Sequence, residues 1–279
     1  MARPRHRLRR AGLGRARPGL GAAALAPALL AARWISKSIN TLLPVAQVGG
    51  DVARTRWLWQ AGVPGPVAGA SVVVDVTSNL LAQVLYAALG VAMLAALDRG
   101  NPVLAAVAAA TALAGMVVLA LYAAQRLGLG RRLQAGRLAR GGRTAAALRA
   151  LAALEGEAGA LYGERRALLR ATLWHLLGWL LRTGETWLAL RFMGVAAGLP
   201  AALVVESLSG LVRSAAFALP GGLGAQEAAI LLVGTQLGLT AETAVALALV
   251  KRVQEFVVSA PGLVAWWVGE RRMALGRRG

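Results

Sequence analysis

Residues 67–97, VAGASVVVDVTSNLLAQVLYAALGVAMLAAL, form the stretch that decides the fold. A helix needs about 20 apolar residues to cross a bilayer, and this longer run holds a single charged residue, Asp75. Residues 98–102 (DRGNP) are typical of a tight turn, and a second apolar run follows at residues 103–124. The two runs predict a pair of transmembrane helices joined by a short turn.

The composition of the whole chain is that of a membrane protein. It has 279 residues, of which 57% are apolar and 15% charged, whereas soluble domains are about half apolar and about a quarter charged. The absence of cysteine excludes disulfides, thiolate chemistry and Cys-ligated metal sites. Since there are also only two histidines, we expect neither a resident metal nor a cofactor.

Further apolar runs occupy residues 168–194, 201–219, 223–239 and 241–268. Together with the first two, they predict an all-α fold, a polytopic transmembrane helical bundle. The sequence Pro220-Gly221-Gly222 separates the run at residues 201–219 from the run at residues 223–239. Residues 201–239 therefore either cross the membrane twice or form a re-entrant hairpin. Both halves are short and the break holds no Arg, which favours the hairpin.

Most of the net charge of +19 lies outside the apolar runs, in residues 1–18, 125–167 and 270–279. By the positive-inside rule, the basic loop 125–167 and the C-terminus are cytoplasmic. The remaining turns are then expected outside, at residues 98–102, 195–200 and 238–242. The basic segments are expected to contact anionic lipid headgroups, and their placement argues against a nucleic-acid partner.

These observations divide the chain into three parts. Residues 1–30 are a basic segment expected to be disordered, and the apolar residues 19–32, which overlap its end, suit a poor span or a signal-peptide core. Residues 31–270 form the transmembrane domain, and residues 271–279 form a basic cytoplasmic tail.

The chain also contains a candidate internal repeat. Residues 37–44 (KSINTLLP) align without gaps with residues 213–220 (RSAAFALP), and in the same register Asp51 falls on Glu227. A repeat of this kind, as in inverted-repeat transporters, predicts two broken or re-entrant helices whose prolines meet around a binding site. Chance similarity in an Ala- and Leu-rich chain is the alternative.

Charged residues within the apolar runs are a second indication of a binding site, because each costs about 2.5–3.5 kcal/mol at the bilayer centre. The spacing of Arg182 and Glu185 would let them pair on one helix. We expect such residues to turn inward, either onto a wet cavity or onto one another as structural ion pairs. The set comprises Asp75, Arg182, Glu185, Glu206, Arg213, Lys251, Arg252 and Glu255.

The Pro220–Gly224 turn would suit the binding of an anion. A helix that begins after it would direct unpaired N–H groups toward a cavity near Arg213, Lys251 and Arg252. This arrangement fits a phosphate or carboxylate headgroup, although a plain turn needs the same glycines. His175 lies in an apolar run and is expected to be a packed side chain rather than a catalytic one.

Several motifs occur in order along the chain: residues 40–54 (NTLLPVAQVGGDVAR), 71–75 (SVVVD) and 219–227 (LPGGLGAQE). They resemble the lysylphosphatidylglycerol synthase transmembrane region, or flippase-like, family. Residues 183–185 (TGE), 206–208 (ESL), 212–217 (VRSAAF) and 250–255 (VKRVQE) look most like the hopanoid-biosynthesis-associated membrane proteins of that family. Family members usually begin with further transmembrane segments, so residues 1–30 are alternatively the product of a mis-assigned start.

The resemblance implies a multi-pass protein of the bacterial inner membrane that handles lipids or hopanoids, without the soluble aminoacyl-transferase domain of bifunctional relatives. We expect it to bind and translocate a hopanoid or an anionic or aminoacylated phospholipid. A lipid-modifying enzyme component, or a scaffold for lipid or hopanoid biosynthesis enzymes, is the alternative. The expected headgroup site comprises Asp51, Arg54, Asp75, Arg182, Glu185, Glu206, Arg213, Pro220, Gly222, Glu227, Lys251, Arg252 and Glu255.

Overall fold

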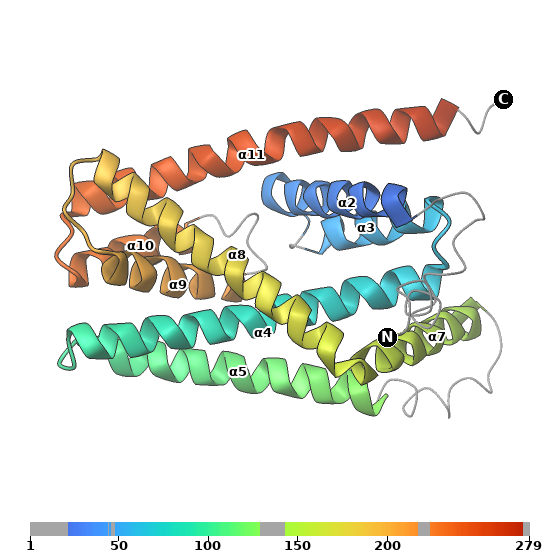
Figure 1. Ribbon diagram of the computed structural model, residues 1–279, viewed down its shortest axis with the longest axis horizontal. Coiled ribbons are helices and arrows are strands. Elements are labelled where there is room, and N and C mark those ends of the chain that lie inside the picture. The colour runs from blue at the N-terminus through green and yellow to red at the C-terminus, as the bar shows by residue number, and fades with distance from the viewer. Residues whose placement is uncertain (1–21, 44, 46–47, 129–142, 217–223, 276–279) are drawn as a thin grey trace. The chain divides into compact units, whose positions relative to one another are not determined.

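The computed structural model describes residues 22–43, 45, 48–128, 143–216 and 224–275, and within them it contains helices and no strand (Figure 1). The predicted all-α fold class is confirmed. The helices are α2 (Ala22–Leu42), α3 (Gly49–Gln60), α4 (Gly65–Leu97), α5 (Leu104–Leu127), α7 (Arg143–Gly163), α8 (Arg165–Phe192), α9 (Leu199–Ala215), α10 (Ala225–Gln236) and α11 (Ala241–Leu275).

Helices α4 and α5 coincide with the two apolar runs predicted to span the membrane. They are the two described helices that are long and apolar enough to cross it by length and composition. The turn between them forms as predicted, because the Asp98 carboxylate accepts hydrogen bonds from the backbone N–H of Gly100 (3.0 Å) and from Asn101 Nδ2 (3.3 Å).

The later apolar runs are helical, but length and composition do not identify them as spans. Helices α8 and α11 are long and carry several charged side chains. Helices α9 and α10 have 17 and 12 residues, which correspond to about 26 Å and about 18 Å, less than the roughly 30 Å hydrocarbon core. The two short helices pack against each other.

The chain packs into two compact units. Unit 1 takes its described residues from 22–27, 55–82 and 113–175, and unit 2 takes them from 28–54, 83–112 and 176–275. The residues of α4, α5 and α8 are divided between them.

Unit 1 contains a helix where the sequence indicated only a connecting loop. Within residues 125–167, α7 forms because its sequence is rich in Ala and Leu, which favour helices. Tyr162 of α7 is buried with Ala70 and Ala158, and its ring meets Tyr122 edge-on at a centroid distance of 5.0 Å. The Arg-rich composition of this segment conceals an apolar helix face.

Unit 2 has the larger apolar core, in which residues of α4, α8, α9, α10 and α11 pack together. Its fully buried members include Leu94, Leu190, Leu208, Ile230 and Leu247.

Small residues allow close helix contacts in this unit. A Cβ atom placed on Gly90 of α4 would lie 1.9 Å from Ser207 Oγ of α9, and one on Gly262 of α11 would lie 2.2 Å from Ser38 Oγ of α2. Small residues at crossings are the usual means by which membrane helices approach one another.

The predicted helix breaks fall at helix ends, but the breaks themselves are not described. Helix α2 ends at Leu42 before α3 begins at Gly49, and α9 ends at Ala215 before α10 begins at Ala225. Pro44, Pro220 and Gly222 lie outside the described residues, as do residues 1–21. The internal repeat and the two broken helices remain predictions.

Candidate functional site

Glu206 of α9 lies at the centre of a buried charge cluster in unit 2. Its side chain is 0% exposed. One carboxylate oxygen accepts a hydrogen bond from Arg182 Nε of α8 at 2.7 Å. The other accepts from Thr186 Oγ1 at 2.7 Å and forms an ion pair with Lys251 Nζ of α11. Three helices therefore meet around one carboxylate.

Lys251 is nearly as buried as Glu206 and has a second hydrogen-bond partner. It is 5% exposed, and its ammonium group also donates to Thr186 Oγ1 at 2.9 Å. Removing one partner from such a buried pair costs about 3–5 kcal/mol, because the other charge is left without compensation. The cluster therefore fixes α9 against α8 and α11. It places two cations, Arg182 and Lys251, around the single carboxylate of Glu206.

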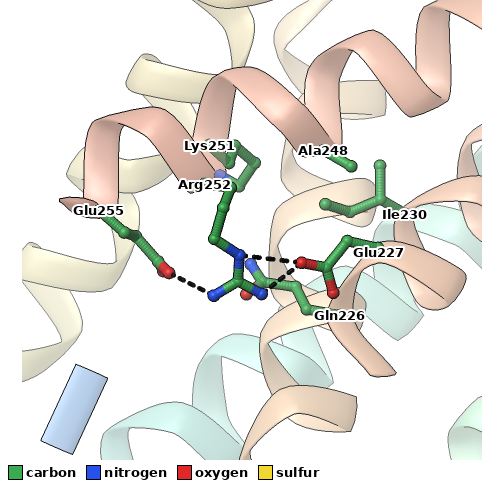
Figure 2. A pocket seen from close by; sticks show the side chains of 7 residues that line it. All are labelled: Gln226, Glu227, Ile230, Ala248, Lys251, Arg252 and Glu255. Atoms are coloured by element: carbon green, nitrogen blue, oxygen red, sulfur yellow. Dashed lines mark hydrogen bonds and ion pairs between the residues drawn. The ribbon is translucent and has the colours of Figure 1, made fainter. Parts of the chain in front are cut away.

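A second cluster adjoins the first between α9, α10 and α11. Arg213 forms an ion pair with Glu255, and its Nη1 atom donates to Gln226 Oε1 at 3.0 Å. Arg252 pairs with Glu255 at 3.2 Å and with Glu227 at 3.0 Å (Figure 2). The Glu255 carboxylate therefore bridges two arginines.

The first turn of α10 positions the acidic member of this cluster. Gly224, with a φ of +81°, leads into α10, and its N–H donates to Glu227 Oε2 at 2.8 Å. An acidic side chain in the first turn also complements the positive end of the helix dipole. Glu227 is thus tied both to its own helix end and to Arg252 of α11.

A small pocket lies between α10 and α11. Its side chains leave no room for a water-sized molecule, so a ligand group could enter only by displacing one of them. Figure 2 shows side chains from the two helices facing each other across it. The lining residues are Gln226, Glu227, Ile230, Ala248, Lys251, Arg252 and Glu255.

The two clusters together hold an excess of positive charge. Four cations, Arg182, Arg213, Lys251 and Arg252, face three carboxylates, Glu206, Glu227 and Glu255, which leaves one positive charge. Lys37 interacts electrostatically with this group and also with Glu185 and Arg33, so the nearby charges do not cancel the excess. The site as a whole could accept one further negative charge.

The predicted Arg182–Glu185 pair does not form. Arg182 instead reaches Glu206 on a neighbouring helix, and Glu185 is exposed. A buried carboxylate on α9 offers a stronger partner than an exposed one on the same helix, since screening by solvent weakens surface pairs.

Polar side chains in the second half of α4 turn inward. Gln83 Nε2 donates to the Gly210 carbonyl at 2.7 Å, and Gln83 also exchanges hydrogen bonds with Ser214. The hydroxyl groups of Tyr86 and Thr183 are 2.6 Å apart. These bonds attach α4 to α9 and to α8 within unit 2.

Asp75, earlier on α4, belongs to unit 1. Its carboxylate lies 3.0 Å from His175 Nε2 of α8. The His175 side chain is 11% exposed, so it is packed, as expected, and it has a polar partner that spacing along the chain did not indicate.

The remaining predicted residues lie on α3 or beyond the described part of the chain. Asp51 accepts a hydrogen bond from Ser36 Oγ of α2 at 3.1 Å, and Arg54 follows about one turn later. Pro220 and Gly222 are not among the described residues.

Comparison with known proteins gives one finding. The sequence pattern of a family described as the lysylphosphatidylglycerol synthase TM region matches residues 18–262. No curated protein and no solved structure matches the chain. The match covers most of both units but does not distinguish the hopanoid-associated members from the rest.

Proposed function

The chain belongs to the family of the lysylphosphatidylglycerol synthase transmembrane region, and on this premise we propose that it binds the anionic headgroup of a lipid in unit 2 and moves that lipid across the bilayer. Family membership ties the protein to the membrane and to lipid handling. The identity of the headgroup and the act of translocation are our proposal.

The excess positive charge of the two clusters carries this proposal. Charged side chains within membrane helices are expensive and commonly mark substrate pathways. Here four cations and three carboxylates lie together, so a headgroup with one negative charge would neutralise the site. A phosphodiester supplies one such charge, whereas an uncharged hopanoid supplies none.

The opposite face of α11 suits the lipid tail. Leu249, Val253 and Val257 follow one another at helical spacing and are exposed, while Lys251 lies on the buried side. An exposed apolar stripe of this kind indicates contact with lipid. The helix therefore has a charged side for a headgroup and an apolar side for acyl chains.

The orientation of the chain follows from the positive-inside rule. We place the protein in the bacterial inner membrane with residues 125–167 and the C-terminus in the cytoplasm, because these segments carry the Arg excess.

Transbilayer movement tests the proposal. Purified protein is reconstituted into vesicles that contain a fluorescent phosphatidylglycerol, and a membrane-impermeant quencher is added to measure arrival at the outer leaflet. We expect the wild-type protein to accelerate this movement. Movement no faster than in empty vesicles, with protein shown to be folded by circular dichroism, would contradict the proposal.

A further inference from the structure

Gln226 has a hydrogen-bond donor that nothing satisfies. The residue is 3% exposed and lies in the first turn of α10, where it lines the pocket. Its Oε1 atom accepts from Arg213, but its buried Nε2 atom has no hydrogen-bond partner in the described part of the chain. Buried amides are nearly always hydrogen-bonded, so an unsatisfied one requires an explanation.

The orientation of this amide is determined by its neighbour. Arg213 is a donor only, so the atom of Gln226 that faces Arg213 must be the carbonyl oxygen. The opposite orientation would bring two donors together and would leave the oxygen unused. The NH₂ group is therefore directed away from Arg213. The hydrogen bond to Arg213 uses only the carbonyl oxygen of Gln226, so this bond does not account for the NH₂ group.

Gln226 and Arg252 converge on the same space from opposite helices. Figure 2 shows the amide of Gln226 beside the guanidinium of Arg252, with Glu255 on the far side. The Glu255 carboxylate occupies the position between Arg213 and Arg252, and its side chain is 12% exposed. A carboxylate between two arginines occupies the place that a phosphate group favours.

We propose that this pocket is a phosphate subsite, in which a phosphodiester oxygen replaces the Glu255 carboxylate between Arg213 and Arg252 and accepts a hydrogen bond from Gln226 Nε2. The inference rests on the proposed function and specifies the chemistry of its ligand. Glu255 serves as the internal anion that occupies the site when no ligand is bound. Gln226 lies in the first turn of α10, so the positive end of the helix dipole adds to the attraction.

Calorimetric binding of soluble probes to the purified protein tests the subsite. Dihexanoylphosphatidylglycerol carries the phosphodiester with short acyl chains, dihexanoylglycerol lacks the phosphate, and sn-glycerol 3-phosphate lacks the chains. The variants are Gln226→Leu, which removes the donor, and Glu255→Gln, which weakens the internal competitor. Gln236→Leu on the exposed end of the same helix is the matched control.

The proposal has distinct expected outcomes. Dihexanoylphosphatidylglycerol should bind to the wild type, about ten-fold more weakly to Gln226→Leu, several-fold more tightly to Glu255→Gln and unchanged to Gln236→Leu. Dihexanoylglycerol should bind to none of them. Binding of sn-glycerol 3-phosphate as tight as that of the phospholipid would assign the subsite to a free phosphate ester, and the lipid-based function would then fail while the subsite stands.

Other outcomes overturn the inference. Equal affinity of wild type and Gln226→Leu for the phospholipid would show that the Gln226 amide does not bind the ligand, and it would leave the proposed function intact. Failure of the wild type to bind any phosphate probe would overturn both. If Gln226→Leu does not fold, Glu255→Gln decides the question, because a gain in affinity cannot arise from misfolding and its absence contradicts displacement of the carboxylate.

Discussion

Lys251 of α11 forms an ion pair with Glu206 of α9, and both side chains are buried. Neither could remain there alone, because an uncompensated charge is costly in the protein interior and in lipid. The pair therefore makes the position of α9 depend on α11, and Arg182 extends that dependence to α8.

The substitution Glu206→Gln should destabilise the protein strongly. It keeps the shape of the side chain but leaves Lys251 and Arg182 without their counter-charge, which should cost about 3–5 kcal/mol. Unfolding by SDS in mixed micelles measures the loss. Glu185→Gln, on an exposed site, should cost less than about 1 kcal/mol, and equal losses for the two variants would contradict the role of Glu206.

A double-mutant cycle should reveal the coupling directly. Glu206→Gln combined with Lys251→Met removes both members of the pair, so the double variant should be less destabilised than the sum of the single ones by about 1–3 kcal/mol. The same micelle unfolding assay gives all four values. Additivity to within about 0.5 kcal/mol would show that the two residues act independently.

Gly90→Ala should destabilise the contact between α4 and α9. The new Cβ atom would lie 1.9 Å from Ser207 Oγ, and relieving the clash should cost about 1–3 kcal/mol. Gly184→Ala is the matched control, because its Cβ atom would meet nothing within 4 Å. That variant should be neutral or gain up to about 1 kcal/mol from helix propensity.

Combining Gly90→Ala with Ser207→Ala should recover part of the loss, since the hydroxyl group is the nearest obstacle. An unchanged unfolding midpoint for Gly90→Ala, or no recovery in the double variant, would show that these helices are not in the close contact described.

Cysteine labelling should reveal the membrane orientation, and the chain has no native cysteine to interfere. In spheroplasts, a membrane-impermeant maleimide should label Arg99→Cys, in the turn after α4, from outside. Ala150→Cys, on an exposed face of α7, should react only after lysis. The reverse pattern would invert the proposed topology.

The sequence was sufficient for properties that depend on composition and local spacing. Uninterrupted apolar runs predicted α4 and α5 almost to their ends, and the turn at Asp98 followed from its Gly and Pro residues. The cost of charge in a membrane also identified Glu206 and Lys251 as residues that must face inward, where they are found.

Partners between helices could not be predicted in the same way. Spacing joined Arg182 to Glu185, but packing brings Arg182 to Glu206, and it likewise brings His175 to Asp75 from far away in the sequence. Such choices depend on which helix faces which, and local periodicity contains no information about that. Helix α7 was missed because its Arg residues obscured its apolar face.

Gln226 was not singled out because a glutamine in a first helical turn is ordinary. Its position between the Gly-rich break and the acidic residue Glu227 was the available signal. Its burial, the direction of its oxygen toward Arg213 and its unsatisfied Nε2 atom are what distinguish it.

The most direct measurement of the central claim is the initial rate of fluorescent phosphatidylglycerol movement in vesicles, for the wild type, Arg213→Gln and Arg191→Gln side by side. Arg213 lies in the charged cluster, whereas Arg191 is an exposed arginine of α8. We expect a rate at least about ten-fold lower for Arg213→Gln and an unchanged rate for Arg191→Gln. Equal rates for all three proteins would contradict the claim.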